Sequence, residues 1–204
     1  SQIEQGRNFC GKIWNSYRLV KGWTVDENAE QPEACRIAVE WFRNKMSQTI
    51  ETVEDHYSKF RISDALMSIY KLFWDDYCSW YLELIKPAYG QPIDKATYND
   101  TLGFFEALLK MIHPVMPFIT EELWQDMAER KDGETIMFQP SPKAGSYDAN
   151  LIASFELAEE AVNAVRSIRQ QKNISPKEAL QVKFKGEFPA EMISVVSKLA
   201  NASS

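Results

Sequence analysis

The chain has 204 residues and a formal net charge of -6; 45% of its residues are hydrophobic and 12% are aromatic. This predicts a globular protein with one large domain or two small ones, and it excludes an intrinsically disordered chain. No apolar run approaches the ~20 residues that span a bilayer and no signal peptide opens the chain, so we expect a cytoplasmic protein without a membrane partner. Three cysteines without C-x-x-C spacing lie in apolar helical patterns and predict reduced, buried thiols: Cys10, Cys35 and Cys78.

The first predicted helix covers residues 3–21 and has two different faces. At about 100° per residue, one face is apolar and carries Phe9, Cys10, Ile13, Tyr17 and Val20. The opposite face carries Arg7, Gly11, Asn15 and Arg18. Residues 1–23 hold four basic side chains against one carboxylate, so this helix gives an acidic chain a local cationic surface.

Four further helices are predicted in the first two thirds of the chain. Pro32 suits the first turn of the second helix, and Ser63 or Asp64 caps a third helix that continues until the next proline. The fourth covers residues 94–113, and Thr120 caps the fifth.

Composition changes near residue 140 and divides the chain into a helical bundle, 1–140, and a small α/β unit, 141–204. The second unit is predicted as a helix, a strand and a helix at 150–172, 180–184 and 189–199. Because a lone strand exposes unpaired backbone groups, we expect its partner strand to come from outside this sequence. We therefore interpret the unit as incomplete at its C-terminal end. The predicted class is mainly α, with a bundle of about five helices followed by this small unit.

No catalytic or metal-binding constellation can be assembled from these residues. The two histidines, His56 and His113, suit a solvated surface position and a helix end. No Cys/His cluster has metal-ligand spacing, and no glycine-rich phosphate loop is present. We predict neither catalytic residues nor a bound metal or cofactor in this part of the protein.

The polar face of the first helix is the main candidate for binding. Arginine supplies a planar donor fork for phosphates and bases, and an exposed helical glycine, which costs roughly 1 kcal/mol against alanine, suits close approach of another surface. From the residues alone, a merely solvated polar face is the favoured explanation of the pattern. A second basic series, Arg166, Arg169 and Lys172, recurs at three-residue spacing; RNA contact, a solvated stripe and a salt-bridge face stay open for it. Phe73, Tyr77 and Trp80 are interpreted as core residues.

Motifs along nearly the whole chain resemble the anticodon-binding domain of bacterial valyl-tRNA synthetases, which are class Ia aminoacyl-tRNA synthetases. They include Gly6-Arg7-Asn8-Phe9, Lys12-Ile13-Trp14-Asn15, Trp74-Asp75-Asp76-Tyr77-Cys78, Trp80-Tyr81-Leu82-Glu83, Lys86-Pro87, His113-Pro114, Pro117-Phe118 and Thr120-Glu121-Glu122-Leu123-Trp124. The last three are shared with leucyl and isoleucyl relatives, whereas the Cys-x-Trp-Tyr-Leu-Glu…Lys-Pro element is more typical of valyl ones.

The resemblance implies recognition of the tRNA(Val) anticodon stem-loop by a non-catalytic fragment of a valine–tRNA ligase. It favours RNA contact for the first-helix set Arg7, Asn8, Gly11, Lys12, Asn15, Arg18 and Lys21. ATP and Mg²⁺ would belong to a catalytic domain outside this sequence, as would an editing domain. Lys45-Met46-Ser47 resembles the ATP-contacting loop of such enzymes, but it lies within a strongly periodic helix and is interpreted as structural. We expect a monomer; the alternative function is a helical protein-interaction module without RNA binding.

Overall fold

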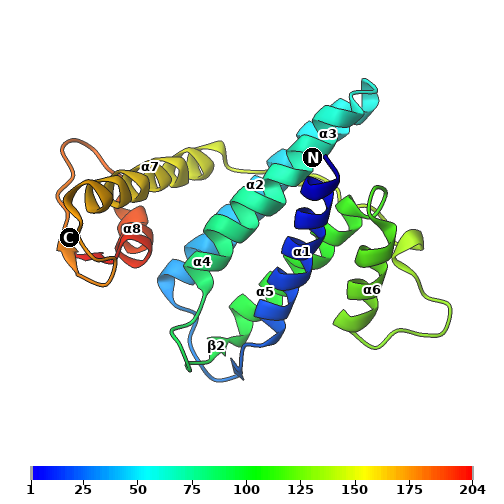
Figure 1. The fold of residues 1–204 in the computed structure, drawn as a ribbon, viewed down its shortest axis with the longest axis horizontal. Coiled ribbons are helices and arrows are strands. Elements are labelled where there is room, and N and C mark those ends of the chain that lie inside the picture. The colour runs from blue at the N-terminus through cyan, green and yellow to red at the C-terminus, as the bar shows by residue number, and fades with distance from the viewer. Residues whose placement is uncertain (1, 204) are drawn as a thin grey trace.

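The structure, a computed structural model, describes residues 2–203 and is mainly helical (Figure 1). Its bundle contains α1 (Gln2–Lys21), α2 (Glu33–Ser58), α3 (Ile62–Lys71), α4 (Leu82–Ile85), α5 (Lys95–Ile112) and α6 (Pro117–Met127). A 3₁₀ turn, Ile136–Phe138, follows α6. The last two helices, α7 (Ala149–Lys172) and α8 (Ile193–Ala200), pack on one side of α2. The predicted class, a helical bundle with a small helix–strand–helix unit, is confirmed.

The apolar face of α1 closes the bundle as predicted. Phe9, Ile13, Tyr17 and Val20 are buried, whereas Cys10 is half-buried. The Tyr17 ring stacks on Phe105 of α5 with 5.4 Å between ring centroids. Because these apolar positions recur every three or four residues, the polar side chains between them face solvent.

The predicted third helix is one continuous helix whose winding changes. Between α3 and α4, residues Leu72–Tyr81 are π-helical, with i→i+5 hydrogen bonds such as that from the Leu82 N–H to the Tyr77 carbonyl. Phe73 and Tyr77 are buried as predicted, while Trp80 is half-buried. The predicted cap at Ser63 or Asp64 is wrong, because the helix begins two or three residues earlier and Arg61 occupies the cap position.

Two short elements set the starts of α5 and α6. Strands β1 (Val25–Asp26) and β2 (Ile93–Asp94) pair in parallel, and the Asp94 carboxylate then accepts a hydrogen bond of 2.8 Å from the Thr97 N–H to cap α5. The predicted cap of α6 by Thr120 is wrong, because Pro117 already occupies the first turn. The Thr120 hydroxyl instead donates to the Met116 carbonyl at 2.8 Å.

The second unit supplies its own strand partner. β3 (Leu180–Gln181) pairs in parallel with β4 (Ala202–Ser203), so the expectation of a partner from outside the chain is wrong, and the strand is shorter than predicted. After a 3₁₀ turn, Ala190–Met192, α8 follows. The buried core continues across the predicted boundary at residue 140, where Trp41 of α2 stacks on Phe155 of α7. The division into two domains stays a prediction.

Cys35 and Cys78 are buried free thiols, as predicted. Burial raises the pKa of both thiols, that of Cys78 to about 12.

Within the described part of the chain, every helix is too short or too polar to cross a bilayer.

A group of carboxylates lies where α7 meets α2 and the π-helical segment. Burial, and next the Asp76 charge, together raise the pKa of Glu159 to about 7, and burial raises the pKa of Asp76 to about 6. The charges of Asp75 and Glu156 also raise the pKa values of Asp76 and Glu159. Lys45 opposes them and pairs with Glu156 at 3.5 Å. The interface therefore favours protonated carboxyl groups.

We expect the substitution Glu159→Gln to make folding stability less dependent on pH. The folded-state pKa of Glu159, about 7, lies above the unfolded value of ~4.3, so stability is fully present below that lower value and is lost as pH rises through about 7. Allowing for partial exposure, the variant should be about 1 kcal/mol more stable than the parent at about pH 8, with no gain at about pH 4. Denaturant unfolding at both pH values measures this, with the exposed neighbour in Glu160→Gln as control. Identical pH slopes for Glu159→Gln and the parent would contradict the prediction.

Candidate nucleic-acid interface

Most of the predicted RNA-binding set is accessible on α1. The exposed members are Arg7, Asn8, Gly11, Asn15, Arg18 and Lys21. Lys12 is half-buried, and its ammonium lies 5.3 Å from the centre of the Trp74 ring. The helix thus carries these residues on its solvent side because its apolar residues are held by the bundle.

Two arginines of this surface have no partner among the residues that the structure describes. Among the residues that the structure describes, no carboxylate pairs with Arg7 or Arg18, and neither guanidinium donates a hydrogen bond. By contrast, Arg36 and Arg43 on α2 pair with Glu40 and Asp100 at 3.1 and 2.8 Å. Arg7 and Arg18 are therefore available cations for an external anion.

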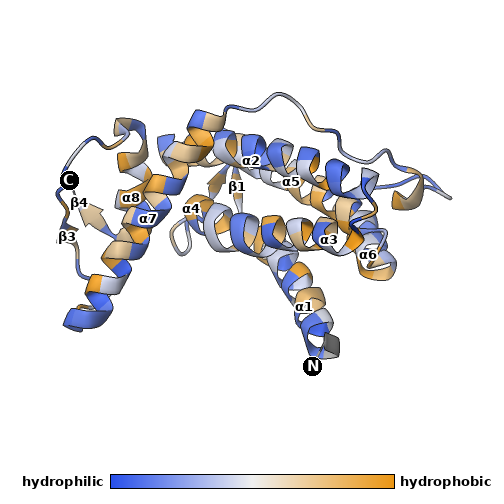
Figure 2. Ribbon diagram, turned by 90° about the horizontal axis from the view of Figure 1, so that it is seen from above, coloured by the Kyte–Doolittle hydropathy of each residue, from blue (hydrophilic) through white to orange (hydrophobic). Residues whose placement is uncertain are grey.

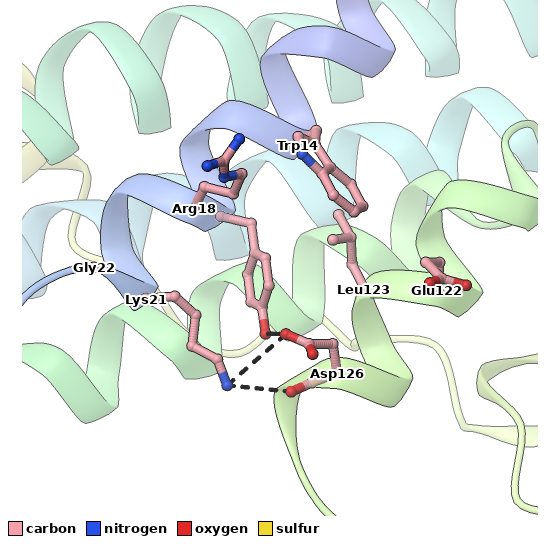
Figure 3. Close-up of a pocket in the computed structure, with 8 residues that line it drawn as sticks. Trp14, Arg18, Lys21, Gly22, Glu122, Leu123 and Asp126 are labelled. Carbon is pink, nitrogen blue, oxygen red and sulfur yellow. Dashed lines mark hydrogen bonds and ion pairs between the residues drawn. The ribbon is translucent and has the colours of Figure 1, made fainter.

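A pocket of about 420 Å³ lies beside this surface, between α1 and α6 (Figure 3). Its lining residues are Trp14, Tyr17, Arg18, Lys21, Gly22, Glu122, Leu123 and Asp126. Trp14 is 41% exposed, and the Arg18 guanidinium points away from Asp126 in Figure 3. The pocket was not predicted from the sequence, because α6 contributes three of its eight lining residues only through tertiary packing.

A fixed carboxylate closes one end of the pocket. The buried Tyr17 hydroxyl donates to Asp126 Oδ2 at 2.5 Å, and Lys21 Nζ donates to the Asp126 carbonyl at 3.2 Å while lying 3.9 Å from Oδ2. Burial raises the pKa of Tyr17 well above its ordinary value, and the hydrogen bond to Asp126 raises it further. The hydroxyl therefore stays protonated at neutral pH and keeps donating to Asp126.

The secondary basic series is only partly exposed. Arg166 and Lys172 are exposed, with the Arg166 guanidinium 5.4 Å from the Trp80 ring centre. Arg169, however, is 6% exposed and donates to the carbonyls of Ser175, Ala200 and Asn201 at 2.7, 3.0 and 3.1 Å. Its assignment as an RNA-contact candidate is wrong, because its guanidinium joins the ends of α7 and α8.

The helical rotation explains this correction. The buried stripe of α7 recurs every three or four residues, and Arg169 continues it after Ala158, Val162 and Val165. Arg166 and Lys172 lie about 60° to either side of Arg169 around the helix. Arg169 turns inward while its neighbours stay outside. In Figures 1 and 2, α7 and α8 lie at one end of the molecule and α6 at the other, so the two predicted basic sets form separate surfaces.

The Lys-Met-Ser segment and His113 both have structural roles in this fold. Lys45-Met46-Ser47 lies inside α2, as predicted. The His113 Nδ1 atom forms a hydrogen bond of 2.7 Å with the Thr120 hydroxyl. His56 is half-buried, not solvated, and its Nδ1 has no hydrogen-bond partner among the described residues. Within residues 2–203, no group of three or more His, Cys, Asp or Glu side chains could hold a metal ion.

Comparison with known proteins identifies the family. The family profile described as the anticodon-binding domain of tRNA ligase matches residues 39–184. The chain is 54% identical over 201 residues to the valine–tRNA ligase of Parabacteroides distasonis and 53% identical over 202 residues to that of Phocaeicola vulgatus; each match covers 98% of this chain and 23% of the relative. The Coxiella burnetii valine–tRNA ligase is 36% identical over 194 residues, covering 90% of this chain and 21% of the relative. The chain thus spans less than a quarter of the curated relatives it matches. Because the profile covers more than half of the sequence, this chain belongs to the family of anticodon-binding domains of tRNA ligases.

Proposed function

We propose that this chain binds the anticodon stem-loop of tRNA(Val) as the non-catalytic recognition part of a valine–tRNA ligase. The observation that carries the proposal is the pair Arg7 and Arg18 on the exposed side of α1 in a member of this family, neither of which pairs with a carboxylate among the described residues. ATP-dependent aminoacylation with Mg²⁺ would take place in a catalytic domain outside this sequence, and editing in another. The same proposal places the protein in the cytoplasm as a monomer.

The role of the chain is to position the tRNA. Arg7 and Arg18 lie eleven residues apart, which is about 16 Å along α1, so they suit separate phosphates of one stem-loop. The burial of Phe9, Ile13 and Tyr17 against the bundle keeps the spacing of the two cations fixed. Holding the anticodon loop here orients the acceptor end toward the catalytic domain of the whole enzyme.

The double substitution Arg7→Ala/Arg18→Ala should weaken tRNA(Val) binding and flatten its salt dependence. Each lost phosphate contact removes about 0.7–0.9 from the slope of log affinity against log salt, so the double variant should lose about 1.5. Titration over a range of salt concentrations measures both quantities. Arg36→Ala/Arg43→Ala is the matched control, since it removes the same charge from arginines that already pair with carboxylates. Unchanged affinity and slope in the first variant would refute the proposal.

The alternative is a helical protein-interaction module that does not bind RNA. Large apolar side chains support it, since Phe60 and Phe118 are 89% and 90% exposed. Titrating tRNA(Val) against a copy with an altered central anticodon base separates the two functions. Preference for the unaltered tRNA supports anticodon recognition, whereas equal or undetectable binding of both RNAs supports the alternative.

A further inference from the structure

The pocket between α1 and α6 is electrically balanced. Its lining carries two cations, Arg18 and Lys21, and two carboxylates, Glu122 and Asp126, so the formal charges cancel. Such a lining has no net positive charge that would concentrate phosphate inside the pocket, and the Arg18 guanidinium at its rim points away from Asp126. Trp14 and Leu123 add apolar wall, and the exposed indole of Trp14 offers a stacking surface. An unpaired RNA base has these properties: it is neutral, flat and polar at its edge.

The pocket residues lie on two levels that match the size of a base. Trp14 and Leu123 form one level, and Asp126 lies at the next (Figure 3), where it accepts the hydrogen bond of the Tyr17 hydroxyl. Three residues separate the levels on each helix, which is about 4.5 Å along the axis. A base stacked on Trp14 therefore presents its edge toward the Asp126 carboxylate.

The Asp126 carboxylate is oriented to accept a hydrogen bond. Tyr17 and Lys21 both approach its Oδ2 atom, and Oδ1 accepts no hydrogen bond from any residue that the structure describes. Adenine, cytosine and guanine carry exocyclic amino donors, whereas the exocyclic groups of uracil are carbonyl oxygens, which a carboxylate repels.

We propose that this pocket binds an unpaired base bearing an exocyclic amino group, which stacks on Trp14 and donates to Asp126. The inference rests on the proposed function and adds to it the class of base and the residue that selects it. Tyr17 is a positioning residue, because it acts on the base only by orienting Asp126.

The test uses hairpin RNAs with the anticodon stem-loop of tRNA(Val), in which one loop base at a time loses only its amino group. Inosine replaces guanosine, purine riboside replaces adenosine, and 2-pyrimidinone riboside replaces cytidine. For the unaltered chain, we expect one loop position at which this change lowers affinity about tenfold. In the variant Asp126→Ala/Tyr17→Phe, the same RNA change should have no effect. The second substitution removes the part-buried Tyr17 hydroxyl, which would otherwise be left without the one acceptor that the described residues give it.

Matched variants separate base selection from general effects. Asp132→Ala removes an exposed carboxylate just beyond α6 and should keep the tenfold difference. Tyr17→Phe alone should reduce the difference, because Asp126 is then held less firmly. Asp126→Asn, which keeps an acceptor for Tyr17, should also reduce it and serves if the double variant fails to fold.

Each outcome has a distinct meaning. If the unaltered chain binds no hairpin, the proposed function fails and this inference fails with it. Salt-dependent binding that is insensitive to amino removal at every loop position overturns the inference and leaves the proposed function standing. A tenfold difference that persists in both Asp126 variants overturns the role of Asp126.

Discussion

Replacing Phe155 by alanine should lower the free energy of unfolding of the whole chain by about 4 kcal/mol. Phe155 is fully buried on α7 and stacks on Trp41 of α2 with 3.8 Å between ring centroids and 11° between ring planes. The substitution removes this contact and leaves a cavity beside a second buried aromatic ring. Because the core is continuous from α2 to α7, the bundle and the second unit should lose stability together.

Denaturant unfolding followed by tryptophan fluorescence and by circular dichroism measures this loss. Coincident transitions by both probes, shifted to lower denaturant, are the expected result. Leu157→Ala is the control, because Leu157 lies on the same helix and is largely exposed. Separate transitions for the two probes, or a loss below about 1 kcal/mol, would show that α7 is not part of the cooperative core.

Replacing Arg169 by alanine should cost about 3 kcal/mol of folding stability. The buried guanidinium donates to three carbonyls near the ends of α7 and α8, and truncation leaves those carbonyls without their donor. Arg169→Lys should restore little of this folding stability, since an ammonium lacks the planar fork that reaches the Ser175 and Ala200 carbonyls together.

The decisive comparison is with Lys172→Ala, which removes an exposed charge from the same helical turn region. We expect the Arg169 variant to unfold at a much lower temperature, and Lys172→Ala to unfold as the parent does. At a temperature where both are folded, tRNA affinity of the Arg169 variant should match that of the parent. Normal thermal stability with reduced affinity would return Arg169 to the RNA-binding surface.

Local periodicity predicted α1 well, because which side chains face the core depends on a repeat that is visible within twenty residues. The burial of Ile13 and Tyr17 and the exposure of Arg7 and Arg18 follow from that repeat. The two missed caps concern single turns, where a proline at the first helical position changed the start of α6.

Features that join distant segments could not be predicted from local periodicity. Tyr17 and Asp126 are 109 positions apart, and no local spacing indicates their hydrogen bond. Arg169 finds its acceptors 31 and 32 positions away, at the end of a helix whose placement is a tertiary result. The strand partner at Ala202–Ser203 is too short to give a pattern of its own. The α1 side of the pocket was thus accessible to sequence reasoning, and the α6 side was not.

The exposure of Trp14 also gives the molecule an optical reporter. Of the six tryptophans, Trp41 and Trp124 are buried and Trp23, Trp74 and Trp80 are partly covered, so a collisional quencher such as acrylamide should act mainly on Trp14. A ligand seated between α1 and α6 would shield that indole, and the quenching constant would then follow occupancy of the pocket without any attached dye.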